Sequence, residues 1–416
     1  MTSLWHPFAD MATTAGNEIV LIHGEGVWVT DDQGNRYLDG ASSLWYANVG
    51  HGRTEIRDAV AAQMAELETF HIFGDFANPP ALALGDRLAE LSPLEDPKVL
   101  LNSGGGNSIE TAVKLARLFH HVNGESQRRH LIHREHGYHG THGIGTSILG
   151  MPYREEFGPL LSDTSQVAHD SIDALAAEIE RIGPDQIAAF VFEPVIGSGG
   201  VYPPQPGYLV AAQELCRSHG ILTIADVVIG GFGRLGTWFG VERFDLQPDL
   251  IVFAKGVTSG YLPLGGVVVS SSVAAPFWEQ GATFMHGITY CGHATCCAAA
   301  NANLDLLTRD GLVYRAAELE GWFHTALSTV ADHPLVGEVR GGIGFMAAVE
   351  LASDALAAHP NSAGLLWSEA RAAGLLSRGL YTGIALAPPL TITESELEFA
   401  DNALRRGLDA TARRLA

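Results

Sequence analysis

The feature that most constrains the fold is a series of short apolar runs that starts near residue 98 and alternates with helical segments. The runs are KVLL, HLIH, IAAFVFE, ILTIAD, LIVFAK and GGVVVS. Continuous apolar runs of this length are typical of strands that are buried on both faces, as in a parallel sheet covered by helices. The sequence therefore predicts an α/β fold with a mainly parallel central sheet.

The two ends of the chain have a different pattern. Near the start, VWVT and RYLD flank the turn-rich DDQGN and predict a β-hairpin, and residues 54–68 and 80–91 have the apolar spacing of amphipathic helices. The C-terminal part mixes helical stretches with short runs such as VGEVR and GFMAAVEL, as in an α+β domain. We predict an N-terminal segment (1–65) that joins the small domain, a large α/β domain (66–308) and a C-terminal small α+β domain (309–416).

Composition narrows the range of partners. The 416 residues include 47 Asp and Glu against 25 Lys and Arg, which gives a formal charge of −22. Such a surface repels nucleic acids and anionic membranes, so neither is expected as a partner. The opening MTSLWHPFADM lacks a basic stretch followed by an apolar run, and no segment has the ~20 apolar residues of a membrane span. We expect a soluble cytoplasmic protein.

Two ionisable residues follow neighbouring apolar runs. ILTIAD ends in Asp226, and LIVFAK ends in Lys255. Ligands of open α/β sheets bind outside the carboxyl ends of the strands, so an acid and a lysine there would face one crevice. The alternative is a structural salt bridge or a pair of capping residues.

Two further segments contain groups that suit a ligand. Ser103-Gly104-Gly105-Gly106 follows KVLL and precedes a helix expected to begin near Ser108, so its backbone N–H groups could bind a phosphate. The spacing is neither that of a dinucleotide fingerprint nor that of a P-loop. In GYHG, Tyr138 offers an aromatic face at another strand end. Taken alone, the glycines and the tyrosine could each have a purely structural role in packing.

Pyridoxal phosphate (PLP) requires this combination of groups. A lysine forms its Schiff base, a carboxylate keeps its pyridine nitrogen protonated, an aromatic ring covers one face and N–H groups bind its phosphate. The chain resembles the class III aminotransferases of PLP fold type I, in particular the ω-amino acid–pyruvate type. The motifs that carry the resemblance are SLWHPF, YLDGASSLWYANVGHGR, GYHG, FVFEPVIGSGGVYPP, IADVVIGGFGRLGTWFG, LIVFAKGVTSGYLPLGG, HGITYCGH and LAPPLTIT.

The resemblance implies PLP as the cofactor and assigns roles to residues of this chain. Lys255 corresponds to the Schiff-base lysine, which also moves the proton between Cα and C4′, and Asp226 to the acid that pairs with the pyridine nitrogen. The ring would lie between Tyr138 above and Val228 below. The full set of cofactor-binding residues that it implies is Gly105, Gly106, Tyr138, His139, Glu193, Asp226, Val228, Lys255 and Thr289.

The resemblance also implies a substrate site and a shared interface. Arg378 corresponds to a mobile arginine that pairs with a substrate carboxylate, with Glu193 as its conditional partner, and Trp45 and Tyr138 would line the pocket. The alternatives are a solvated loop arginine and a core tryptophan. Thr289 corresponds to a threonine that reaches the phosphate of the partner subunit, so we expect a homodimer, or a tetramer built from dimers, with shared active sites.

The expected reaction is transamination of an ω-amine or ω-amino acid, with pyruvate or another 2-oxo acid as acceptor. The alternative keeps PLP but ends in epimerisation, amino-group migration, decarboxylation or bond formation at Cβ or Cγ, because all of these start from the same carbanion. Two departures from the family keep it open. Gly106-Asn107 stands where the family carries Ser-Glu, and Asp226-Val227-Val228 where it carries Asp-Glu-Val.

Histidines and cysteines offer rival interpretations. His133, His136, His139 and His142 recur at every third residue, but glycines interrupt the segment and a helical ligand pair needs i, i+4 spacing. We therefore expect no metal site. The four cysteines are Cys216, Cys291, Cys296 and Cys297, and the last three surround an expected helix start. We interpret them as small buried hydrophobes rather than reactive thiols.

Overall fold

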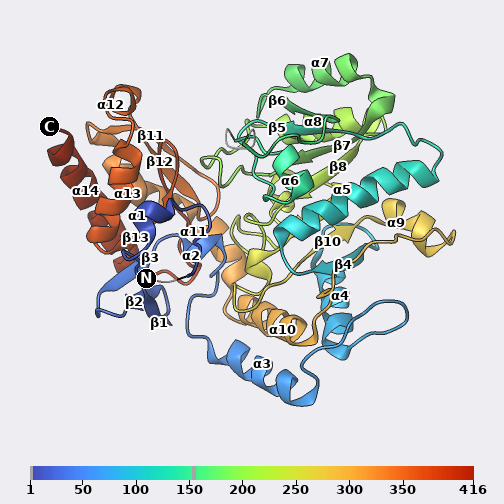
Figure 1. The fold of residues 1–416 in the computed structure, drawn as a ribbon, viewed down its shortest axis with the longest axis horizontal. Coiled ribbons are helices and arrows are strands. Elements are labelled where there is room, and N and C mark those ends of the chain that lie inside the picture. Colours follow the sequence, from blue (N-terminus) through green and yellow to red (C-terminus); the bar gives the residue numbers. More distant parts are fainter. Residues whose placement is uncertain (1–2, 152–155) are drawn as a thin grey trace.

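The centre of the protein is a seven-stranded sheet with strand order β4-β10-β9-β8-β7-β5-β6, seen at the right of Figure 1 in the computed structural model, which describes residues 3–151 and 156–416. The strands are β4 (Lys98–Asn102), β5 (His130–Arg134), β6 (Thr164–Val167), β7 (Ile187–Phe192), β8 (Leu222–Asp226), β9 (Leu250–Phe253) and β10 (Gly265–Val269). All pairs from β6 to β9 are parallel, whereas β10 runs antiparallel to both of its neighbours. The predicted α/β fold with a mainly parallel sheet is confirmed.

Helices cover both faces of this sheet. They are α5 (Gly105–Val122), α6 (Gly143–Ser147), α7 (Ile172–Ile182), α8 (Tyr208–Ser218) and α9 (Ser271–Trp278). Every residue of β8 is buried, and successive side chains join different cores: Ile224 packs in the cluster that contains Val113 of α5, and Ala225 in the cluster that contains Leu209 of α8. This two-sided burial is the reason that the strands read as continuous apolar runs.

The two chain ends meet in smaller sheets. One has the order β1-β2-β3-β13, made of β1 (Leu21–Glu25), β2 (Trp28–Asp31), β3 (Arg36–Asp39) and β13 (Leu375–Leu376). It confirms the predicted hairpin and pairs Leu38 with Leu375. The other has the order β11-β12-β15-β14, made of β11 (Val336–Arg340), β12 (Ala347–Leu351), β15 (Gly383–Leu386) and β14 (Arg378–Gly379).

The remaining helices surround these sheets or connect them to the large domain. They are α1 (Met11–Thr14), α2 (Ser42–Trp45), α3 (Thr54–Glu66), α4 (Pro79–Leu91), α10 (Ala294–Arg309), α11 (Leu312–Leu327), α12 (Ser353–Ala358), α13 (Ser362–Ala372) and α14 (Glu394–Leu415). The helices expected at 54–68 and 80–91 correspond to α3 and α4. Both ends of the chain lie on the same side of the molecule (Figure 1). The domain boundaries at 65/66 and 308/309 stay predictions.

One buried arginine joins the chain start, the large domain and the C-terminal part. Arg234 is fully buried, and its Nη1 donates hydrogen bonds to the carbonyls of Phe345 (3.1 Å) and Pro388 (2.6 Å). Its Nη2 donates to Ser42 Oγ and Asn48 Oδ1, both at 2.9 Å. Burial lowers the pKa of this guanidinium to about 9. The four acceptors compensate for the loss of water and hold the three parts together.

In the part of the chain that the structure describes, no helix is both long enough and apolar enough to cross a membrane.

Candidate active site

Asp226 and Lys255 follow two adjacent parallel strands, as the sequence predicted. Asp226 is the last residue of β8, and Lys255 lies just beyond β9, where it opens a short 3-10 turn (Lys255–Val257) with φ at +47°. Burial lowers the pKa of the Lys255 amine to about 8, although the carboxylates of Asp226 and Glu193 oppose this change. A lysine with this pKa can both release and accept a proton near neutral pH.

The Asp226 carboxylate is held at both oxygens. Its Oδ1 accepts a hydrogen bond from the backbone N–H of Val228 at 3.0 Å, and its Oδ2 lies 2.8 Å from Nδ1 of His139. Both side chains are buried. The aspartate is therefore fixed in orientation before any ligand arrives, and His139 acts through this carboxylate.

Glu193 is the second buried carboxyl group of the site. Its Oε1 and Oε2 each accept a backbone N–H at 3.0 Å, from Tyr138 and Gly197 respectively. Burial raises the pKa of Glu193 to about 7; His139 acts in the opposite direction, and Asp226 adds to the increase. Within residues 3–151 and 156–416, no ion pair joins Glu193 to Arg378, so its expected role as partner of that arginine stays a prediction.

The glycine-rich turn differs from expectation in one respect. Helix α5 begins at Gly105, not near Ser108, because glycines 105 and 106 adopt helical geometry and the Ser108 hydroxyl donates to the Gly104 carbonyl at 2.8 Å. The N–H groups of the first helical turn have no partner further back in the helix, so they remain available to an anion. A Cβ on Gly105 would lie 3.0 Å from a methyl group of Val228, which places that valine against the turn.

The positive charge of Arg378 acts on both Tyr138 and Lys255. Burial raises the pKa of the Tyr138 phenol, and the positive charge of Arg378 opposes this change. The same Arg378 charge adds to the lowering of the pKa of Lys255. Arg378 lies on β14, opposite Ala385 of β15. The chain thus brings its expected carboxylate-binding arginine to the site from a strand that is remote in sequence.

Of two further predicted site residues, Trp45 is buried and Thr289 is exposed. Trp45 is only 1% exposed and packs in a core with Ile229 and Ala387, while its indole N–H has no hydrogen-bond partner among the described residues. Its role as a pocket-lining residue stays a prediction. Thr289 is exposed on the loop between α9 and α10, where a second subunit could contact it.

The four histidines do not converge on one point. His139 bonds Asp226, and the ring of His142 lies against Gly106. His136 stacks on Tyr202 with ring centroids 4.7 Å apart, and potential ligand atoms of Glu135, His136 and His169 lie within 4.8 Å of one another. The Arg340 guanidinium lies 4.4 Å from the Tyr202 ring, and this positive charge opposes a bound cation. We interpret the group as an aromatic cluster, and the expectation of no metal stays a prediction.

Three of the four cysteines lie in the interior as small buried residues. Cys216, Cys296 and Cys297 are buried, and burial raises the pKa of the Cys216 and Cys297 thiols to about 12. Burial also raises the pKa of Cys291, which is partly exposed. Burial agrees with the structural interpretation for Cys216, Cys296 and Cys297, whereas for Cys291 it stays a prediction.

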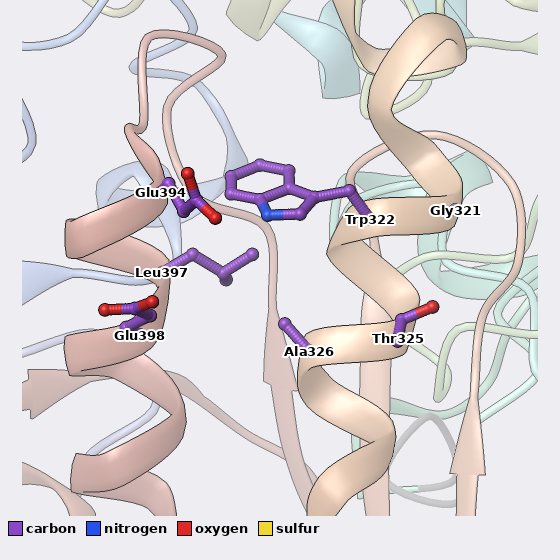
Figure 2. A pocket seen from close by; sticks show the side chains of 7 residues that line it. All are labelled: Gly321, Trp322, Thr325, Ala326, Glu394, Leu397 and Glu398. Carbon is purple, nitrogen blue, oxygen red and sulfur yellow. The ribbon is translucent and has the colours of Figure 1, made fainter.

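A hollow of about 380 Å³ between α11 and α14 is a second candidate site (Figure 2). The indole of Trp322 and the side chain of Leu397 point into it, and the carboxylates of Glu394 and Glu398 line its α14 side. Two carboxylates without a lysine or arginine among the lining residues would repel a phosphate or a 2-oxo acid. We therefore assign the chemistry to the crevice at Lys255.

Comparisons with known proteins agree with this geometry. The family model of class III aminotransferases matches residues 11–408. The putrescine–pyruvate aminotransferase of Pseudomonas aeruginosa is 34% identical, over 94% of this chain and 91% of its own. An (S)-enantioselective ω-transaminase from Thermomicrobium roseum superposes with a TM-score of 0.93 at 38% identity, covering 98% of this chain and 96% of the other. A PLP-bound amine transaminase from an uncultivated Pseudomonas species superposes with a TM-score of 0.92 at 34% identity, covering 99% of each chain.

The chain belongs to the class III aminotransferases. It is a PLP-dependent enzyme of fold type I that catalyses transamination, and the alternative of non-transaminating carbanion chemistry is not favoured by these comparisons. The residues present fit the cofactor: a partly buried lysine and a fixed aspartate follow adjacent strands, and the first turn of α5 at Gly105 and Gly106 offers backbone N–H groups to a phosphate.

Proposed function

We propose that this aminotransferase transfers the amino group of an ω-amine or ω-amino acid to pyruvate or another 2-oxo acid. The observation that carries the proposal is the position of Arg378, whose positive charge acts on both Lys255 and Tyr138. In a protein with a formal charge of −22, a 2-oxo acid needs such a local cation for its carboxylate. The names of the P. aeruginosa and T. roseum proteins support the same substrate classes.

The cofactor-binding roles follow from the crevice. When bound, PLP supplies an electron sink that stabilises negative charge on the carbon next to the amino nitrogen. We assign Asp226, oriented by His139, to the pyridine nitrogen, and Val228 and Tyr138 to the two faces of the ring. The first-turn N–H groups of Gly105 and Gly106 would bind the phosphate. In this arrangement the ring and the phosphate are bound by different parts of the sheet edge.

Lys255 moves the proton in this proposal. Its Nζ accepts the proton from the carbon that carries the amino group and returns it to the other end of the same conjugated system. A pKa of about 8 suits both steps, because neither protonation state is strongly preferred near neutral pH.

Substrate binding combines a cation with a partly apolar wall. The planar guanidinium of Arg378 would bind both oxygens of the acceptor carboxylate. Tyr138 and Trp45 would line the space for the rest of the substrate. An amine donor that lacks a carboxylate does not need this cation, which is why the arginine must leave the site or be screened in that half-reaction.

We further propose a homodimer in which Thr289 of one subunit reaches the phosphate site of the other. The loop that carries Thr289 packs on the segment around Phe73, since a Cβ on Gly287 would lie 3.1 Å from the Phe73 ring. The surface of these two segments is rich in exposed apolar side chains: Phe70, Phe73, Phe76, Met285 and Tyr290. Apolar surface of this kind is typical of a protein–protein interface.

The absorption spectrum tests the proposed reaction. The yellow absorbance of the bound cofactor should disappear when a terminal primary amine is added without acceptor, and pyruvate should restore it. Lys255→Ala is the control, because it removes the proton-transfer group while Asp226 and the phosphate turn remain. If the wild-type absorbance does not change with any ω-amine, or if pyruvate does not restore it, the proposed substrates are wrong.

A further inference from the structure

The ring of His142 lies directly over the backbone of Gly106. A Cβ on Gly106 would be 3.1 Å from both Cε1 and Nδ1 of the imidazole. The preceding loop is equally close, because a Cβ on Gly140 would be 3.1 Å from the Gly106 Cα. The edge of the imidazole therefore occupies the space that a side chain at position 106 would need.

This contact bears on the departure of this chain from its family. Gly106 stands where the family carries a serine, so the turn lacks the hydroxyl donor that the resemblance implies at this point. The side chain of Asn107 is bound within the turn, where its Oδ1 accepts the hydroxyl of Ser103 at 2.9 Å. His142, by contrast, is exposed and has a ring nitrogen next to Gly106.

An imidazole is chemically suited to this position. It can donate a hydrogen bond to a phosphate oxygen and, when protonated, can add a positive charge. A local donor of this kind matters in a protein with a formal charge of −22, because the overall field repels the phosphate. The carboxylate of Glu110 also contacts this loop, where its Oε1 accepts a hydrogen bond from the backbone N–H of Ile144 at 2.6 Å.

We propose that His142 binds the phosphate of PLP and supplies the side-chain donor that is missing at Gly106. The inference rests on the proposed phosphate site at Gly105 and Gly106 and extends it to the loop after GYHG. Gly106 and His142 then act together: the absence of a side chain at Gly106 leaves space for the imidazole, and the imidazole donates the hydrogen bond to the phosphate that glycine cannot donate.

Cofactor affinity provides the first test. The dissociation constant of PLP, measured by dilution and dialysis of the holoenzyme, should rise about 10-fold in His142→Ala, as expected for the loss of a hydrogen bond to a charged group. The dissociation constant of His142→Gln, which keeps a hydrogen-bond donor, should lie between those of the wild type and His142→Ala. His121→Ala is the matched control, because His121 is an exposed histidine at the far end of α5. The affinity for pyridoxal, which has no phosphate, should not change in any of these variants.

A double-mutant cycle provides the second test. Gly106→Ser should weaken PLP binding in the presence of His142, because hydroxyl and ring compete for one space, and strengthen it in the His142→Ala background. Additive effects would contradict the inference. If the wild type binds PLP and pyridoxal equally, the phosphate site at Gly105 and Gly106 is itself wrong. If the wild type prefers PLP and His142→Ala prefers it by the same factor, only the role of His142 is wrong.

Discussion

The Nδ1 atom of His139 and the Oδ2 atom of Asp226 lie 2.8 Å apart between two buried side chains. With the Val228 N–H on the other oxygen, this bond fixes the carboxylate. Because an amide cannot keep the pyridine nitrogen protonated, we expect Asp226→Asn to lower the rate constant of the amine half-reaction by about 10²–10⁴-fold, a loss of the size found for removal of a proton-holding group. Single-turnover absorbance measurements give this constant.

The same contact predicts a smaller effect for the histidine. His139→Phe keeps a ring in the buried space but removes the hydrogen bond, so the rate constant should fall by about 10-fold, in line with ~1.5 kcal/mol for a bond to a charged group. Because His139 acts through Asp226, the variant should have little further effect in an Asp226→Asn background. An equally large loss in that background would show that His139 acts independently.

The pKa of Lys255 predicts how the apoenzyme recovers its cofactor. Only the neutral amine reacts with an aldehyde, and burial lowers the pKa of Lys255 to about 8. The rate constant for PLP uptake should therefore rise with pH and reach a plateau just above about pH 8. Stopped-flow absorbance over pH 6–10 measures it. A rate that continues to rise toward the ordinary lysine pKa of 10.5 would contradict this environment.

Glu193 predicts a pH-dependent stability. Its pKa is raised from 4.5 to about 7, so between these values the folded apoenzyme holds a proton that the unfolded chain releases. The contribution of Glu193 to the free energy of unfolding is therefore largest below about pH 4.5 and is lost as the pH rises to about 7.

Glu193→Gln removes this titration but also alters the two N–H contacts. The difference in melting temperature between wild type and variant should thus shift in favour of the variant from pH 5 to pH 8. Glu318→Gln is the control, because Glu318 lies on α11 in the C-terminal part of the chain. A difference that is independent of pH would contradict the raised pKa.

Replacing Arg378 should change the KM for the acceptor but not the KM for the amine donor. Arg378→Gln should raise the KM for pyruvate by about 10–100-fold, because a charged hydrogen-bonded contact is worth ~1.5–3 kcal/mol. The KM of an amine donor without a carboxylate should change little. Arg57→Gln serves as the control, since Arg57 is a surface residue whose side chain is 69% exposed. An equal change for both substrates would exclude carboxylate binding as the role of Arg378.

Arg234 predicts a large loss of stability. Arg234→Met keeps an unbranched side chain but leaves four buried acceptors without their donor, so the free energy of unfolding should fall by about 3 kcal/mol or more, since one unsatisfied buried polar group costs about 1–3 kcal/mol. Chemical denaturation of the holoenzyme measures it. Arg315→Met is a milder comparison, because that side chain is only partly buried and bonds two carbonyls. A loss no larger than that of Arg315→Met would contradict the role of Arg234.

The sequence predicted the elements whose signals are local. The runs that became β7, β8 and β9 are apolar on both faces, and the chemistry of the site follows from Asp226 and Lys255 at their ends. The sequence could not show that β10 runs antiparallel, since strand direction depends on how the chain crosses over. Strand β6, TSQV, was missed because it is mostly polar and lies at the edge of the sheet.

Contacts between remote side chains were also beyond the sequence. Nothing in its spacing places His142 over Gly106, and the helix that starts at Gly105 was expected three residues later because glycine disfavours helices. Arg234 lies inside the motif GGFGRLG, but its acceptors come from segments far away in the chain. The Arg234 bonds form only when both chain ends pack on the central domain.

The Arg234 bonds also order events during protein synthesis. The strands from β4 to β10 are synthesised before Pro388, so much of the central sheet can form first. At that stage the Arg234 guanidinium can bind Ser42 and Asn48 but not yet the Pro388 carbonyl. The start of the chain, although made first, gains its contacts with Leu375 and Ala387 only when the end has been made. A chain that ends before β15 would thus keep the contacts of Asn48 with the central domain but lack the carbonyls of Ala387 and Pro388 that Ser42 and Arg234 bind.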